Sequence, residues 1–249
     1  MEQETKHLLP ERDTCVYTQY YCEENVWKLC EHIRNEHPSE LTNLFTVFIS
    51  NHHKAVPLWQ QKASREPHKP VVWDYHVICV YKMEDGEAVV YDLDSRLSFP
   101  CLFNEYVAKA IQPDELLEAE FHRIFRVVPA SLYLELFASD RSHMLRDDKS
   151  WCAPPPAYPC ISTKDGTKVN FSVPETKNNL QNFIVMDVKV GVGHVMNTRD
   201  FANYFGCSRE MVIKFLEYSE LQDRKGVMGS GLDQQTAVID QCNGEKVVQ

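Results

Sequence analysis

The stretch VVWDYHVICVY, residues 71–81, decides the fold. β-Branched and aromatic residues fill it, which predicts a single buried β-strand whose side chains alternate between two faces. One face would carry Val71, Trp73, Tyr75, Val77, Cys79 and Tyr81. On the other face Asp74 and His76 interrupt a row of apolar side chains, and burial of such groups is costly unless they are hydrogen-bonded. A core histidine satisfied by hydrogen bonds would explain the interruption, and so would a catalytic histidine.

A second strand follows this one closely. Residues 83–94 read MEDGEAVVYDLD, a turn signal followed by a strand that becomes polar at its end. A three-residue turn loop would set His76 directly opposite Asp94, with Asp92 on the diagonal. A two-residue Asp-Gly turn would shift the register by one and move both carboxylates to the other face. The sequence leaves both registers open.

Upstream of these strands, an amphipathic helix is predicted to begin at residue 22. The apolar side chains that recur at helical spacing are Val26, Leu29, Cys30 and Ile33. Pro38 would end the helix. Cys22 would then lie at the helix N-terminus, where the dipole and free backbone N–H groups favour the thiolate. Glu23 and Glu24 in the first turn oppose this effect. The alternative for Cys22 is a small buried apolar residue, and Cys30 is expected in the core.

Composition restricts the class of protein. The chain has 249 residues, of which 43% are hydrophobic and 11% aromatic, as in a globular protein with a substantial core. Its net charge of −10 disfavours a nucleic-acid-binding protein that follows phosphates. The sequence contains no apolar run long enough for a membrane span and no N-terminal signal core. We therefore expect no membrane or nucleic-acid partner.

The nine cysteines are an odd number without regular spacing. Neither a Cys-x2-Cys pair nor a His-Glu-x2-His motif occurs, so a structural zinc site and a zinc protease site are not expected. We expect a reducing, cytosolic compartment in which most of these thiols are free and several are simply buried.

The rest of the chain is predicted as short elements around this centre. Strands are expected over residues 44–50 and 123–128, helices over 104–110, 113–121, 130–138, 180–186 and 199–205, and a polar loop over 51–69. Residues 139–144 are expected to form a structural turn in which Arg141 pairs with a carboxylate; a second site built on Asp140 and His143 is the alternative.

A cysteine at a helix start, a histidine on a strand and an aspartate on the next strand suit thiol catalysis. The imidazole would take the thiol proton, the carboxylate would orient the imidazole, and the backbone N–H at the cysteine would help to bind an oxyanion. Such an order of residue types also arises by chance in a chain of this length.

Five sequence blocks are more specific, because together they resemble the eukaryotic protein N-terminal glutamine amidohydrolases. These blocks are YCEEN (21–25), WDYHV (73–77), YDLD (91–94), FPCLF (99–103) and FASDRSHM (137–144). The resemblance implies an α+β fold, an antiparallel sheet flanked by helices, with an active site arranged as in papain and transglutaminases. It implies a catalytic triad of Cys22, His76 and Asp92, with Asp94 as a neighbour. The resemblance covers one catalytic domain over 15–206. The polar, charged residues 1–14 predict a loose arm, and the weaker apolar pattern and glycines of 207–249 predict an extension beyond the family's length that is partly helical and then mobile.

The same resemblance implies deamidation of N-terminal glutamine to glutamate with release of ammonia, in the N-degron pathway of protein degradation. It implies a monomer without metal or other cofactor, in the cytoplasm and also the nucleus. The free α-amino group of the substrate needs an acidic subsite, for which Asp74 and Glu23 are candidates by proximity; strand hydrogen bonding and helix-dipole complementation are their alternatives. The chain departs from the family at Val192, where an aromatic residue is expected between two glycines. A papain-like protease or transglutaminase, and a non-catalytic adaptor that binds N-terminal residues, are the competing functions.

Overall fold

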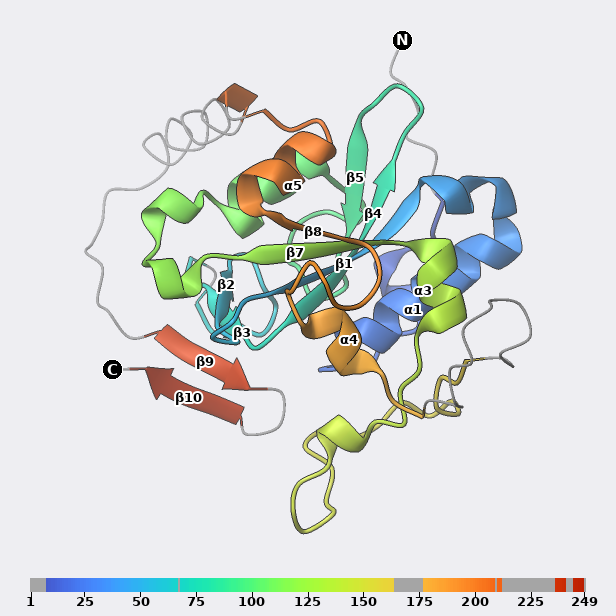
Figure 1. Ribbon diagram of the computed structural model, residues 1–249, viewed down its shortest axis with the longest axis vertical. Coiled ribbons are helices and arrows are strands. Elements are labelled where there is room, and N and C mark those ends of the chain that lie inside the picture. Colours follow the sequence, from blue (N-terminus) through green and yellow to red (C-terminus); the bar gives the residue numbers. More distant parts are fainter. Residues whose placement is uncertain are drawn as a thin grey trace.

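The fold is seen in a computed structural model, which describes residues 8–66, 68–163, 177–208, 210–211, 236–240 and 244–248. Its centre is a six-stranded antiparallel sheet with the strand order β6-β5-β4-β1-β7-β8 (Figure 1). These strands are β1 (Leu44–Ser50), β4 (His76–Lys82), β5 (Ala88–Tyr91), β6 (Cys101–Leu102), β7 (Ile124–Pro129) and β8 (His194–Asn197). The expected α+β fold with a mostly antiparallel sheet is confirmed.

A smaller second sheet has the strand order β10-β9-β3-β2. It consists of β2 (Val56–Leu58), β3 (Val71–Trp73), β9 (Thr236–Asp240) and β10 (Gly244–Val248). β9 runs parallel to β3, while the other two pairs are antiparallel. Two segments of the predicted C-terminal extension are therefore strands, and most of the remaining extension lies outside the described residues.

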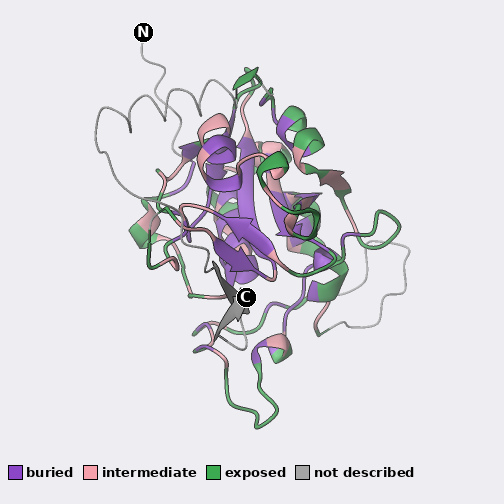
Figure 2. Ribbon diagram, turned by 90° about the vertical axis from the view of Figure 1, so that its left-hand side faces the viewer, coloured by how far each residue is buried: buried purple, intermediate pink, exposed green. Residues whose placement is uncertain are grey.

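Helices cover both faces of the six-stranded sheet. One face packs against α1 (Cys22–Glu36), α3 (Ala130–Leu136) and α4 (Leu180–Ile184), and the other against α2 (Phe103–Tyr106), the π-helical turn Val107–Ile111 and α5 (Thr198–Tyr204). Side chains alternate along the central strands, so Phe48 and Val77 join the first apolar cluster while Val47 and Ile78 join the second. Figure 2 shows the buried residues gathered in the middle of the molecule.

The stretch 71–81 was predicted as one strand, and this prediction is wrong: β3 ends at Trp73 and β4 begins at His76. The chain bends between them because one local hydrogen bond and one from a distant segment replace those of a sheet. The Asp74 carboxylate accepts one from the next backbone N–H at 2.9 Å, and the Asp74 carbonyl accepts one from the Ser50 hydroxyl at 2.8 Å. As a result Trp73 and His76, which were expected on opposite faces, stack with ring centroids 5.4 Å apart.

The hairpin between β4 and β5 has the three-residue loop. The Met83 N–H donates to the Glu87 carbonyl at 2.7 Å and closes the loop. This is the first of the two registers that the sequence left open. Strand pairing extends back only to Cys79 and Tyr91. The predicted strand over 88–94 therefore ends early, and its last residues form a loop.

Several other elements match their prediction. These are α1, β1, β7, α3, α4 and α5. Three differences stand out: the expected loop 51–69 contains β2, the expected helix 113–121 is two short 3-10 turns (Asp114–Leu116 and Ala119–Phe121), and the edge strand β8 was not expected. Further 3-10 turns are Arg12–Thr14, Pro38–Asn43 and Ser142–Met144. Within the described part of the chain, no helix has the length and apolar character that a bilayer span requires.

Candidate active site

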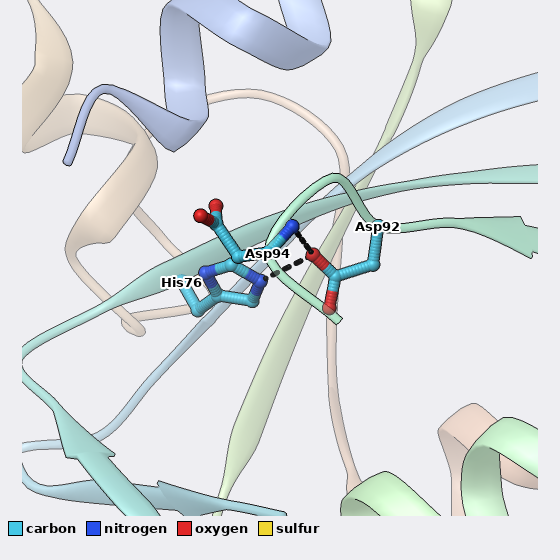
Figure 3. Close-up of side chains that lie close together, drawn as sticks. All are labelled: His76, Asp92 and Asp94. Carbon is cyan, nitrogen blue, oxygen red and sulfur yellow. Dashed lines mark hydrogen bonds and ion pairs between the residues drawn. The ribbon is translucent and has the colours of Figure 1, made fainter. Parts of the chain in front are cut away.

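The His76 imidazole is hydrogen-bonded to the Asp92 carboxylate, with 3.1 Å between Nε2 and Oδ1 (Figure 3). His76 opens β4 and Asp92 follows β5, so the hairpin brings them together at the end opposite its turn. Three other donors reach the same carboxylate. The Asp94 backbone N–H donates to Oδ1 at 2.9 Å, and Oδ2 accepts from the Tyr106 hydroxyl at 2.7 Å and from the Gln61 amide at 3.2 Å. Asp92 is thus held as a fully hydrogen-bonded anion.

The electrostatics of this pair make the His76 ring a stronger base. Burial works to lower the pKa of His76, but the Asp92 charge and hydrogen bond raise the pKa overall. Burial works to raise the pKa of Asp92, yet the charge and hydrogen bond of His76 and the Tyr106 hydroxyl hold it below its ordinary value. Because Nε2–H donates to Asp92, Nδ1 is the nitrogen left for chemistry, and it has no hydrogen-bond partner among the described residues.

Asp94 lies beside this pair without orienting the ring. Its carboxylate accepts a hydrogen bond from the Tyr17 hydroxyl at 2.6 Å. Burial, together with the nearby Asp92 charge, raises the pKa of Asp94. His76, Asp92 and Asp94 offer one ligand atom each within 4.8 Å of one another, so they are the described residues that could hold a metal ion. Hydrogen bonds already use both oxygens of Asp92, and we assign no metal to this group.

Cys22 is the first residue of α1 and is buried. It belongs to the same apolar cluster as Val77, the residue after His76, and a hydrogen bond from the Val77 backbone helps to stabilise its thiolate. Burial is the main effect on the thiol and raises the pKa of Cys22 well above its ordinary value, with smaller increases from the Glu23 and Asp94 charges. In this state the sulfur carries its proton, so nucleophilic attack requires a base.

Glu23 lies next to the Cys22 thiol and is completely buried. Its Oε2 is 3.7 Å from the Cys22 sulfur and accepts a hydrogen bond from the Tyr75 hydroxyl at 3.0 Å. Its Oε1 is 3.3 Å from Nε2 of His143. The Tyr133 hydroxyl donates a hydrogen bond to the backbone carbonyl of Glu23 at 2.9 Å. Glu23 is therefore an internal charge of the site.

Asp74, the other predicted acidic residue, lies at the bend between β3 and β4 and is partly exposed. Its charge raises the pKa of both Cys22 and His143, after the larger effects of burial and of Glu23 on each. The structure thus brings the charges of Asp74 and Glu23 close to Cys22.

In the turn over residues 139–144 Arg141 pairs with a carboxylate, as expected. That carboxylate is Glu24, which receives two hydrogen bonds of 2.9 Å from the guanidinium. His143, which sequence reasoning named only for an alternative second site, lies beside Glu23. Two other side chains were missed, Tyr106 and Gln61 on Asp92. Tyr106 resembles any apolar residue of its helix, and Gln61 stood in a predicted polar loop, so neither carried a local signal.

Comparison with known proteins gives this site its context. A family model described as N-terminal glutamine amidase matches residues 17–205. The chain belongs to this family. The protein N-terminal glutamine amidohydrolase of Danio rerio is 47% identical to it over 203 residues, which cover 82% of this chain and 95% of the relative. The Homo sapiens protein of that name is 47% identical over 197 residues, 79% of this chain and 91% of the relative. The Drosophila mojavensis protein is 42% identical over 208 residues, 84% and 97% of the two chains.

The departure from the family that the sequence predicts at Val192 falls in the loop that leads into β8. The Arg126 guanidinium holds this loop through backbone carbonyls, including that of Val192 at 3.0 Å. Gly191 has a φ of +79°, and a Cβ there would come within 2.2 Å of the Asn182 carbonyl oxygen. Main-chain contacts therefore fix the loop, and the Val192 side chain packs at the edge of the apolar cluster beside α4.

Proposed function

We propose that this member of the N-terminal glutamine amidase family converts N-terminal glutamine of peptides and proteins to glutamate and releases ammonia. The observation that carries the proposal is the buried His76–Asp92 pair, together with Cys22 at the start of α1. Nδ1 of His76 has no hydrogen-bond partner among the described residues, and Cys22 contacts the backbone of Val77, the residue after His76. The relatives that support it are named for this activity and match most of the chain.

In the proposed mechanism Cys22 is the nucleophile, His76 the general acid and base, and Asp92 the residue that orients His76. His76 takes the thiol proton at Nδ1, and the sulfur attacks the glutamine side-chain carbonyl carbon, so a C–S bond forms and the carbonyl oxygen becomes an oxyanion. The backbone N–H groups at the start of α1 stabilise that oxyanion. His76 then protonates the leaving nitrogen, ammonia departs, and a thioester remains.

Hydrolysis of the thioester completes the cycle. His76, now neutral, removes a proton from water as the water oxygen attacks the thioester carbon. The C–S bond breaks, the thiolate recovers its proton, and the product is an N-terminal glutamate. The arrangement is that of papain and transglutaminases in its chemical logic, and it needs no metal or other cofactor.

The free α-amino group must also be recognised, or internal glutamines would react. Of the two acidic candidates, Asp74 suits an incoming ammonium better because it is partly exposed. The Glu23 carboxylate is completely buried and already contacts Tyr75 and His143. We therefore propose Asp74 as the α-amino subsite.

The wider setting is also part of this proposal. The chain acts as a monomer in the N-degron pathway, in the cytoplasm and also in the nucleus, on protein substrates and without nucleic-acid or membrane partners. Residues 15–206 form the catalytic domain between an N-terminal arm and a C-terminal extension.

The test uses the full chain and matched peptides that begin with Gln, Asn or acetylated Gln. We expect ammonia release and a mass gain of about one dalton, from exchange of NH2 for OH, with free N-terminal Gln alone. Cleavage of the peptide backbone would overturn the proposal and indicate a protease. Crosslinking of the glutamine to an amine would indicate a transglutaminase, and binding without a mass change would indicate an adaptor. The Cys22→Ala variant is expected to be inactive.

A further inference from the structure

The first turn of α1 buries two adjacent glutamates, and one surface turn supplies a cation to each. Glu24 receives the Arg141 guanidinium through two hydrogen bonds of 2.9 Å. Glu23 receives the His143 imidazole, with 3.3 Å between Nε2 and Oε1. Both carboxylates are completely buried, and a buried anion is costly unless a cation is close.

The two pairs differ in what else they contact. The Glu24 carboxylate meets a guanidinium, which stays charged at any pH compatible with the fold. The Glu23 carboxylate meets an imidazole, whose charge changes near neutral pH, and its other oxygen lies 3.7 Å from the Cys22 sulfur. A negative charge at that distance opposes ionisation of the sulfur. The charge state of His143 therefore decides how strongly Glu23 opposes the nucleophile.

We propose that His143 is an electrostatic positioning residue for Cys22: as an imidazolium it balances the buried Glu23 carboxylate and so allows the neighbouring sulfur to ionise. This inference rests on the proposed function in taking Cys22 as the nucleophile. It adds a second histidine–carboxylate pair next to the Cys22 sulfur, and it needs no contact between His143 and substrate.

The groups that face His143 agree with this role. Glu23 and Glu24 face it from α1, and Asp74 faces it from the bend before β4. Burial works to lower the pKa of His143, but these charges, Glu23 above all, raise it above its ordinary value. Glu24 is already balanced by Arg141, which leaves Glu23 as the charge that His143 neutralises. The His143 side chain is 16% exposed while the Glu23 side chain is 0% exposed, so His143 is the member of the pair that solvent reaches.

The test measures the sulfur directly, without substrate. The full chain is treated with iodoacetamide between acidic and alkaline pH, and alkylation of the Cys22 peptide is followed by mass spectrometry, because other cysteines such as Cys160 are exposed. For His143→Gln we expect Cys22 alkylation at neutral pH to fall about tenfold or more, since one lost compensating charge shifts the thiol pKa upward. His143→Lys keeps the charge and should retain most of the rate.

The decisive variant is the double substitution Glu23→Gln/His143→Gln. It removes the opposing charge together with its counter-charge, so alkylation should return to within about threefold of the wild-type rate. A His143→Gln protein that folds and keeps the wild-type rate would overturn the inference, and so would a double variant as slow as the single one. If this pattern holds while Gln peptides are not turned over, the proposed function fails and the role of His143 stands.

Discussion

Nε2 of His76 lies 3.1 Å from Oδ1 of Asp92, although extension of the hairpin register would set Asp94 opposite this histidine. The ladder stops at Tyr91, and the following loop folds back so that the Asp94 N–H donates to the same Asp92 oxygen. Asp92, which is diagonal to His76 in the register, thus becomes the hydrogen-bond partner of the ring. Asp94, which would be directly opposite, is only a neighbour. This difference can be tested by a matched pair of variants.

Asp92→Asn should cost far more activity than Asp94→Asn. The amide would offer Nε2 no negative charge and would favour the wrong tautomer, so we expect a loss of about 100-fold or more in kcat, against less than about tenfold for Asp94→Asn. Ammonia release from an N-terminal Gln peptide measures kcat for both variants. The reverse order would assign the orienting role to Asp94.

Tyr106→Phe should move the acid limb of the kcat/KM profile to higher pH. The Tyr106 hydroxyl donates to Asp92 at 2.7 Å and helps to keep the pKa of that carboxyl low, so its removal raises the pKa. A lost hydrogen bond to a buried charge also costs about 1.5–3 kcal/mol of unfolding free energy.

Tyr81→Phe is the matched control for this variant, because its hydroxyl donates at 2.7 Å to Glu40, away from the site. It should leave the pH profile in place. Equal shifts in the two variants would mean that Tyr106 does not act through Asp92.

The His76–Asp92 pair should stabilise the fold over a limited pH range. The folded pKa of His76 is raised above its ordinary value of 6.5, so its contribution is complete below that value and is lost as the pH rises through the folded pKa. The folded pKa of Asp92 is lowered below 3.8, so its contribution is present above that value and is lost as the pH falls through the folded pKa.

Urea unfolding of wild type and His76→Gln across this range measures the effect. The difference in unfolding free energy should be largest between these two ordinary values and should shrink as the pH rises above 6.5. A difference that grows over the same range would contradict the direction of the His76 shift.

Arg141→Gln should destabilise the fold strongly. It leaves Glu24 buried without its cation, and loss of one partner of a buried ion pair costs about 3–5 kcal/mol. Arg34→Gln is the control, because Arg34 and Glu31 form a partly exposed pair at 3.6 Å that should contribute less than about 1 kcal/mol. Chemical denaturation of both variants gives the comparison, and similar losses would show that burial of the Glu24 pair does not matter.

The elements that the sequence predicted well are those whose signal is local. The helical spacing of apolar residues after Cys22 and the stop at Pro38 gave α1 its bounds and Cys22 its place at the helix start. The β-branched run over residues 44–50 gave β1. In these segments burial of a periodic apolar face and the preferences of single residues favour the same structure, so neighbours in the chain carry enough information.

Only the tertiary structure decided which carboxylate holds His76, where the chain bends before it, and what surrounds Glu23. Each of these depends on groups from distant segments: Ser50 at the Asp74 bend, Gln61 and Tyr106 on Asp92, and His143 on Glu23. A hydrogen bond or ion pair between such groups leaves no periodic trace in either segment. Such a contact forms because the sheet and its helices bring the two segments together. Packing of the whole core determines that arrangement.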